Sequence, residues 1–225
     1  MLAPDARLLI FTKAPVEGKV KTRLIPSIGI ANATQLHRLL TTHVVKIATA
    51  SQLCPVELWC SPDTSHTFFQ QLTQQYPVTL FTQQGKDLGE KMFHAVSKAM
   101  QSATRVIIIG SDCLQFTTQH LQQALQSVAG STKRVVLTPA QDGGYVLIGM
   151  NHIDCRLFEH IAWGSADVLT QTRRVLQQLG RDWQELSCLK DIDVESDLKD
   201  IADYASGYPL GLELNALLHK IQTLL

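Results

Sequence analysis

The sequence predicts one α/β domain in which helices cover both faces of a mostly parallel, mixed sheet. Two observations carry this prediction: short apolar segments rich in β-branched residues recur along most of the chain, and amphipathic helical patterns separate them. The length of 225 residues suits one large domain and leaves little room for two. Strands that alternate with helices form βαβ units with right-handed crossovers, which gives a three-layer α/β/α architecture.

Seven segments are expected to form strands, namely residues 7–12, 56–60, 78–82, 105–110, 134–138, 145–149 and 183–189. The first, fourth and fifth are continuously apolar rather than alternating, as is typical of strands covered by helices on both faces. Helical periodicity is found in residues 31–50, 88–101, 117–130 and 209–225. Residues 151–182 are also expected to be helical and to pack on the sheet as a cap within a single domain 1–225.

Composition and charge exclude several classes of function. The 20 Lys and Arg residues balance 20 Asp and Glu residues, and no segment combines clustered basic residues with aromatic ones, so nucleic acid is not an expected partner. No segment approaches the ~20 apolar residues that span a bilayer. The first residues fit neither a signal peptide nor a transit peptide, so a soluble, cytoplasmic protein is expected. The five cysteines and eight histidines form no zinc or disulfide pattern.

The loops that follow the expected strands are the places to look for a site. The carboxyl ends of parallel strands meet at one edge of the sheet, and ligands of such sheets bind beyond that edge. Glycine and aspartate are concentrated there, in the loops at residues 13–24, 85–91, 110–113, 139–145 and 191–197.

The loop after the first strand is basic. In "FTKAPVEGKVKTRL", Gly18 allows a close backbone approach and Lys13, Lys21 and Arg23 supply cations, as a phosphate site requires. The loop is not a Walker A motif, because Lys13 stands where that motif needs a glycine, and no dinucleotide-binding glycine pattern occurs. A solvated surface loop is the alternative, and the position at the end of the first strand favours phosphate binding.

Asp112 ends the very apolar segment "VIIIGSDC", where its carboxylate can reach the ligand cleft. An oxygen ligand of this kind suits Mg²⁺ or Mn²⁺, which share the phosphates of a substrate. The alternative is a helix cap, in which Ser111 or Asp112 accepts N–H groups of the next helix.

A second acidic segment, "DIDVESD", follows the last expected strand. The alternation places Asp191 and Asp193 on the same side of an extended chain, and two carboxylates so placed repel unless a cation or a proton lies between them. The structural alternative is a helix start in which Glu195, Ser196 and Asp197 interact with the helix dipole. Both can hold at once.

The segment "PAQDGGY" contains tandem glycines, Gly143 and Gly144, that permit a sharp turn and bring Asp142 and Tyr145 to the sheet edge. A tight hairpin would explain the glycines without any ligand. The functional interpretation is an acceptor or sugar subsite, to which Trp163 of the expected cap also belongs.

Together these motifs resemble the radical-SAM/selenodomain-associated transferases, an uncharacterised family with a glycosyltransferase A fold. The resemblance covers residues 7 to 205 and rests on K-A-P-x-x-G-x-x-K-T-R-L at Lys13 to Leu24, G-S-D-C at Gly110 to Cys113, D-G-G-Y at Asp142 to Tyr145 and D-x-D-x-x-x-D-L at Asp191 to Leu198. The chain is distantly similar to 2-phospho-lactate guanylyltransferase and the molybdenum-cofactor guanylyltransferases, which share this nucleotide-diphospho-sugar transferase fold. It departs from the family at Leu114, where proline is usual, and has Ser111-Asp112-Cys113 where many glycosyltransferases have D-x-D.

The resemblance implies a division of the site into subsites. The nucleotide phosphates would bind to the basic loop and the nucleoside would face the "LGEK" segment, with the nucleotide contacts at Lys13, Gly18, Lys21, Thr22, Arg23, Leu88, Gly89 and Ser111. Asp112 would hold Mg²⁺, with Asp191 and Asp193 as the second acidic element.

Three functions remain open from the sequence. The leading one is a Mg²⁺-dependent transfer of a nucleotidyl group from a nucleoside triphosphate to a small phosphorylated acceptor, in which Lys21, Arg23, Asp112 and Asp142 would be catalytic. The second is a glycosyltransferase that uses a nucleotide-diphospho-sugar. The third is a nucleotide-binding protein without catalytic activity.

Overall fold

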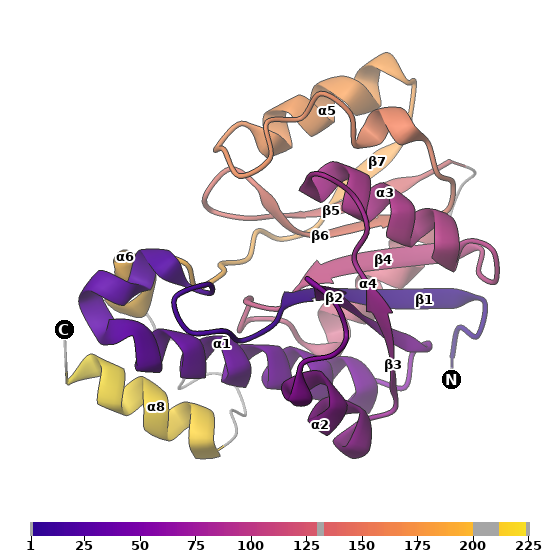
Figure 1. The fold of residues 1–225 in the computed structure, drawn as a ribbon. Helices are drawn as coiled ribbons and strands as arrows, with labels where there is room; N and C mark the ends of the chain where they lie inside the picture. Colours follow the sequence, from indigo (N-terminus) through magenta and orange to yellow (C-terminus); the bar gives the residue numbers. More distant parts are fainter. Residues whose placement is uncertain (1, 130–132, 200–211, 224–225) are drawn as a thin grey trace.

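A computed structural model describes residues 2–129, 133–199 and 212–223 and shows a seven-stranded sheet between two layers of helices (Figure 1). The strands are β1 (Ala6–Lys13), β2 (Val56–Ser61), β3 (Val78–Thr82), β4 (Arg105–Gly110), β5 (Val135–Pro139), β6 (Tyr145–Met150) and β7 (Trp183–Glu185). Their order is β3-β2-β1-β4-β6-β5-β7, and β6 is antiparallel to both of its neighbours while the other pairs are parallel. The predicted α/β fold with a mostly parallel, mixed sheet is confirmed.

The central strands are apolar throughout because both of their faces are covered. In β1, Leu8 and Ile10 pack toward one helical layer and Leu9 toward the other, and all three are buried. One layer contains α1 (Ile25–Ala50), α2 (Thr67–Gln75) and α4 (Thr118–Ala129), and the other contains α3 (Leu88–Ala99) and α5 (Val168–Gln178) (Figure 1). Burial on both faces of the sheet therefore explains the continuous apolar pattern of these strands.

A third apolar cluster includes residues of α1 but is separate from the two clusters that cover the faces of the sheet. It joins the short 3₁₀ helix η1 (Thr22–Leu24) and α1 to α6 (Glu195–Lys199) and to α8 (Leu212–Gln222), which lies against α1 in Figure 1. Its buried members include Leu24, Leu114, Ile192 and Leu218. Leu24 belongs to the basic loop and Ile192 to the acidic segment, so one apolar cluster supports these two loops together.

Several element boundaries differ from the predictions. Helix α1 begins at Ile25 rather than at residue 31, with a break at Gly29, whose φ of 78° favours glycine. The region 151–182 is largely turns around η2 (Cys155–Leu157) and α5, with Gly164 at a φ of 84°. It is helical over a much shorter length than expected.

The last strand is also shorter than expected. Strand β7 ends at Glu185, which pairs with Leu137, and pairing resumes only as a single bridge between Ala140 and Leu189, beyond Pro139. Proline lacks the N–H group that a regular ladder would use. The last helix spans Leu212–Gln222, and the rest of the segment expected to be helical falls partly outside the described residues. No helix in the described part of the chain is long and apolar enough to cross a membrane.

Candidate active site

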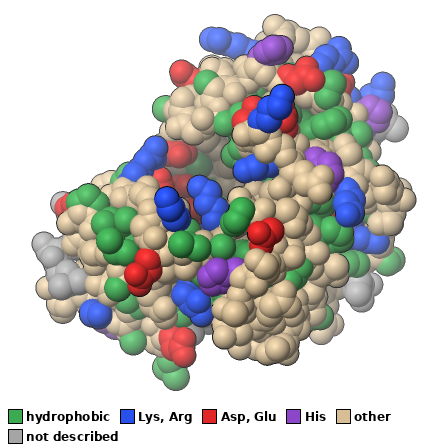
Figure 2. All heavy atoms as spheres, in the orientation of Figure 1, with side chains coloured by type: hydrophobic (Ala, Val, Ile, Leu, Met, Phe, Trp, Pro, Cys, Tyr) green, Lys and Arg blue, Asp and Glu red, His purple; other side chains and the backbone are tan. Residues whose placement is uncertain are grey.

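Two neighbouring hollows lie at the carboxyl edge of the sheet, and Figure 2 shows this face hollowed, with Lys, Arg, Asp and Glu side chains around the depression. We call the first the basic pocket. It has a volume of about 260 Å³, and its charged lining residues are Lys13, Lys19, Lys21, Arg23, Asp112 and Asp193. We call the second the apolar cavity; it has a volume of about 190 Å³. Phe11 and Leu88 line both hollows, which are therefore contiguous.

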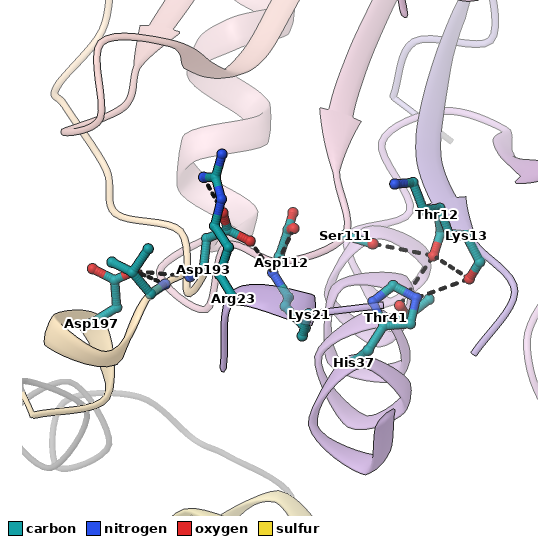
Figure 3. Close-up of polar contacts among 11 residues, drawn as sticks. Thr12, Lys13, Lys21, Arg23, His37, Thr41, Ser111, Asp112, Asp193 and Asp197 are labelled. Carbon is teal, nitrogen blue, oxygen red and sulfur yellow. Dashed lines mark hydrogen bonds and ion pairs between the residues drawn. The ribbon is translucent and has the colours of Figure 1, made fainter. Parts of the chain in front are cut away.

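The basic loop turns Lys21 inward. Gly18 and Lys21 both adopt positive φ angles, of 73° and 47°, and the side chain of Lys21 is only 3% exposed. Its Nζ donates a hydrogen bond to Asp112 Oδ2 at 2.8 Å and lies 3.8 Å from Asp193 Oδ1 (Figure 3). Arg23, by contrast, is 63% exposed and its guanidinium contacts Asp193 Oδ2 at 2.8 Å. The loop therefore has one buried cation and at least one that is accessible.

Asp112 is held in its anionic form by Lys21. Burial alone would raise the pKa of this carboxyl, but the charge of Lys21 and its hydrogen bond outweigh the burial, so the pKa is lowered. The side chain remains 36% exposed and lines the basic pocket. Helix α4 begins at Thr118, and Thr117 Oγ1 accepts the hydrogen bond of His120 N at its start. Asp112 and Ser111 therefore do not cap this helix.

A chain of buried hydroxyl groups fixes the floor of the basic pocket. Ser111 Oγ donates to Thr12 Oγ1 at 3.1 Å, and Thr12 Oγ1 lies 3.2 Å from Thr41 Oγ1 on α1. His37 Nε2 lies 2.9 Å from the carbonyl oxygen of Lys13 (Figure 3), and burial lowers the pKa of this histidine. The hydroxyl of Ser111 is thus engaged within the fold.

Asp191 and Asp193, the two aspartates of the last loop, have different surroundings. Ile192, between them, is buried in the third cluster, and its N–H donates to the carbonyl oxygen of Asp112 at 3.2 Å. Burial, reinforced by the charges of Asp112 and Asp142, raises the pKa of Asp191 to about 6. Asp193 instead faces Lys21 and Arg23. The raised pKa of Asp191 therefore reflects first its burial and then the neighbouring carboxylates.

The helix start proposed for this segment also exists. Asp197 Oδ2 accepts hydrogen bonds from the N–H groups of Asp193 at 2.8 Å and Val194 at 2.7 Å, immediately before α6 (Figure 3). Asp197 therefore stabilises the turn that presents Asp193 to the basic loop. The structural and functional interpretations of this segment are compatible.

The tandem glycines form a tight connection between β5 and β6. Asp142 Oδ1 accepts a hydrogen bond from Gly144 N at 2.9 Å, and Gly143 has a φ of 90°. A Cβ at Gly143 would lie 2.1 Å from the carbonyl oxygen of Ala166, and the carbonyl oxygen of Gly143 accepts a hydrogen bond from Leu169 N at 2.9 Å. The turn is thereby docked against the start of α5, with Asp142 on the rim of the apolar cavity.

Trp163 and the start of α3 form one wall of the apolar cavity. A Cβ at Gly89 would lie 2.4 Å from Trp163 Nε1 and 2.3 Å from the carbonyl oxygen of Phe158, so only glycine allows this close packing. The rings of Trp163 and Tyr145 meet edge to face with centroids 6.4 Å apart. Gly89 therefore shapes the cavity rather than lining it.

The structure brings most of the predicted residues together at the two hollows, although their roles stay predictions. Gly18, Gly89 and Gly143 set the backbone and do not line either hollow, and neither does Asp191. Thr22 and Ser111 line the basic pocket. Sequence reasoning missed Gln83, whose Nε2 donates to the carbonyl oxygens of Thr12 at 3.1 Å and Trp59 at 2.8 Å. The only signal for it was its position directly after the third strand.

Asp112, Asp191 and Asp193 are the acidic residues expected to bind a divalent cation. Among the described residues, no group of three or more His, Cys, Asp or Glu side chains is arranged to hold a metal ion. Asp112 lines the basic pocket, and its charge adds to the burial that raises the pKa of Asp191. Mg²⁺ typically binds through one or two carboxylates, waters and substrate phosphates. The carboxylates of Asp112 and Asp191 are of the ligand type that Mg²⁺ prefers in that mode, whereas Asp193 is already paired with Arg23.

Comparison with known proteins agrees with this geometry. The chain has the nucleotide-diphospho-sugar transferase fold. It is 28% identical to a "putative nucleotide-diphospho-sugar transferase" from Desulfovibrio desulfuricans G20, with a TM-score of 0.87 over 98% of this chain and 96% of that one. It is 11% identical to a nucleotidyl transferase from a Methanothermobacter species, with a TM-score of 0.64 over 90% and 99% of the two chains. It is 9% identical to a 4-diphosphocytidyl-2C-methyl-D-erythritol synthase from Anaerococcus prevotii DSM 20548, with a TM-score of 0.59 over 90% and 96%.

The last two likenesses show the fold alone, and the structural neighbours as a group are transferases that use nucleotides. The chain belongs to the DUF2064 family, described as an uncharacterized protein conserved in bacteria, whose model matches residues 44–165. No curated protein matches the sequence. The resemblance to radical-SAM-associated transferases and to guanylyltransferases stays a prediction.

Proposed function

We propose that the protein is a Mg²⁺-dependent nucleotidyltransferase that transfers a nucleotidyl group from a nucleoside triphosphate to a small phosphorylated acceptor. The observation that carries this proposal is the pairing of buried Lys21 with Asp112 inside a pocket that also contains Lys13, Lys19 and Arg23. Such a pocket neutralises a polyphosphate, and phosphoryl chemistry requires mainly positioning and charge neutralisation.

In the proposed reaction an oxygen of the acceptor phosphate attacks the α-phosphorus of the triphosphate. The bond from the α-phosphorus to the oxygen that bridges it to the β-phosphorus breaks, and pyrophosphate leaves with that oxygen. Lys21 and Arg23 offset the negative charge that develops on the phosphate oxygens. When bound at Asp112 and Asp191, Mg²⁺ would add further charge neutralisation at the same phosphates.

The site needs no protein base for this reaction. The second pKa of a phosphate monoester is about 6, so the attacking oxygen is already ionised at neutral pH. This fits the lining of the basic pocket, in which the histidine, His37, is held against a backbone carbonyl and has a lowered pKa. Asp142 would act as a base only for a hydroxyl acceptor.

A glycosyltransferase that uses a nucleotide-diphospho-sugar is the second candidate. It is favoured by the 28% identity to the Desulfovibrio protein and by the apolar cavity beside the basic pocket, with Asp142 on its rim. The triplet Ser111-Asp112-Cys113 in place of D-x-D favours nucleotidyl transfer.

A pyrophosphate-release assay over the four common nucleoside triphosphates, with phosphorylated acceptors and Mg²⁺, tests the proposal. We expect release that requires both acceptor and Mg²⁺ and that is lost in Asp112→Asn. Transfer from nucleotide-diphospho-sugars alone would instead identify a glycosyltransferase. Nucleotide binding that survives Asp112→Ala, with no turnover of either donor class, would identify the third candidate, a binding protein.

A further inference from the structure

The lining of the apolar cavity limits the chemical class of acceptor that can bind there. Its walls come from Phe11 and Ile108 of the sheet, Met92 of α3, Val168 of α5 and the rings of Tyr145 and Trp163. Asp142 is the only charged residue among those that line it. Burial raises the pKa of Tyr145, so its phenol is neutral at physiological pH.

The size of the cavity limits what it can hold. An apolar protein cavity of roughly 150 Å³ binds benzene. The volume here is about 190 Å³, which fits a single six-membered ring with a small substituent. Leu88, which is 43% exposed although apolar, lies on the border shared with the basic pocket. A ligand that extends from one hollow to the other would cover this side chain.

The cavity is preformed rather than a gap between mobile side chains. Trp163 and the carbonyl oxygen of Phe158 pack directly on Gly89, and the turn at Gly143 is docked on Ala166 and Leu169. Both contacts depend on the absence of a side chain at a glycine. A preformed apolar cavity binds a matching group without the cost of ordering its walls.

The cavity leads to the proposed reaction centre. Gly110 is among its lining residues, and a Cβ on Gly110 would lie 3.0 Å from Asp112 Oδ1. A ring in the cavity can therefore place its own phosphate beside Asp112 and Lys21.

We propose that the acceptor is a phosphate monoester of an apolar, ring-sized alcohol, whose apolar body occupies this cavity while its phosphate reaches the basic pocket. This inference rests on the proposed function. The polar groups of the wall are few, namely the carboxylate of Asp142, the hydroxyl groups of Ser165 and Tyr145 and the indole N–H of Trp163. Phosphates of polyols such as sugars or inositol are disfavoured, because most of their hydroxyl groups would be buried against apolar side chains.

A matched pair of acceptors tests the inference with the unaltered protein. Cyclohexyl phosphate and myo-inositol 1-phosphate share a six-membered carbon ring and a phosphate and differ in five hydroxyl groups. We expect kcat/KM for pyrophosphate release to be about tenfold or more higher with cyclohexyl phosphate, because unsatisfied hydroxyl groups are costly to bury. Equal use of both acceptors, or a preference for inositol phosphate, would overturn the inference and leave the proposed function standing.

Binding without a nucleotide separates the two proposals. We expect cyclohexyl phosphate to shift the NMR resonance of the Trp163 indole N–H, assigned by its loss in Trp163→Phe, while inositol phosphate leaves it in place. This shift without any pyrophosphate release would support the assignment of the cavity and count against the proposed reaction. An indole resonance that neither compound moves would overturn the assignment.

Two variants of the wall check the location. Trp163→Ala should lower kcat/KM about tenfold for cyclohexyl phosphate and by a smaller factor for inositol phosphate. Val168→Thr, which keeps the volume but adds a hydroxyl group, should act in the same direction if Trp163→Ala does not fold. A loss that is equal for both acceptors in either folded variant contradicts the inference.

Discussion

Lys21 Nζ lies 2.8 Å from Asp112 Oδ2 although the two residues are 91 positions apart in the chain. The lysine is almost completely buried, and the aspartate remains open to the basic pocket. The contact joins the loop after β1 to the loop after β4, which are neighbouring parallel strands. A buried cation that faces an accessible carboxylate is suited to receive a phosphate and a divalent cation at the same place.

Replacing Lys21 with methionine should therefore impair both stability and nucleotide binding. The volume of the side chain is preserved, but the partly buried Asp112 loses its cation, at a cost of about 1–3 kcal/mol of unfolding free energy. Triphosphate affinity should fall about tenfold or more, since a charge-assisted contact is lost. Urea denaturation and isothermal titration with nucleotides measure the two effects. Lys46→Met, at an exposed position on α1, is the matched control and should change neither.

Replacing Asp191 with asparagine should stabilise the protein at high pH in the absence of Mg²⁺. The pKa of Asp191 is raised from 3.8 to about 6, so between these values the unfolded chain has released a proton that the folded protein still holds. Stability from this group is therefore fully present below about pH 3.8 and is lost as pH rises through 6. Two pKa units correspond to about 3 kcal/mol.

Denaturation of both proteins in EDTA at several pH values measures this effect. Asp191→Asn should be about 2–3 kcal/mol more stable than the parent at pH 8, and the gain should vanish near pH 3.5, where the parent carries a neutral carboxyl group. Addition of Mg²⁺ at pH 8 should reduce the difference. A gain that does not depend on pH would show that the carboxylate is not destabilised by its surroundings.

The turn at Gly143 should not accept alanine. Its φ of 90° disfavours any side chain, and the added Cβ would lie 2.1 Å from the carbonyl oxygen of Ala166. We expect Gly143→Ala to lose about 3 kcal/mol or more of unfolding free energy, through the combined effects of strain and displaced backbone. Gly180→Ala is the matched control, since Gly180 also has a positive φ but no atom within 4 Å of the added Cβ. Its loss should be about 1 kcal/mol. Equal losses in the two variants would show that the packing against Ala166 contributes nothing.

Much of the fold could be predicted from the sequence because burial on both faces of a strand dictates its composition. The central strands were found for this reason, and the strand-end rule then placed Asp112 beside the basic loop. The turns around Gly164 and the end of β7 could not be found in this way. They depend on where the chain meets its neighbours, such as the bulge at Pro139, and not on local periodicity.

The candidate site shows the same division. The sequence identified the cations of the basic loop but not which of them is buried. The burial of Lys21 depends on its positive φ and on its contact with Asp112 in the loop after β4. Gln83 escaped notice since its partners are the backbone carbonyls of Thr12 and Trp59, which only the assembled sheet brings together. The size of the apolar cavity likewise depends on the packing of Trp163 on Gly89.

Helix α8 should stabilise the basic and acidic loops of the candidate site through the third apolar cluster. Leu218 of α8 is buried in the cluster that contains Leu24, next to Arg23, and Ile192, between Asp191 and Asp193. Leu218→Ala should cost about 2–5 kcal/mol if the cavity does not collapse. Because the same cluster supports the basic and acidic loops, we also expect a several-fold loss of triphosphate affinity under conditions where the variant is fully folded. Leu72→Ala on α2 is the matched control: Leu72 is equally buried, but in the cluster between the sheet and the layer of α1, α2 and α4. It should lose similar stability and keep its nucleotide affinity, as measured by denaturation and calorimetric titration. Equal affinity losses in the two variants would show that general destabilisation, and not the support of these loops, weakens binding.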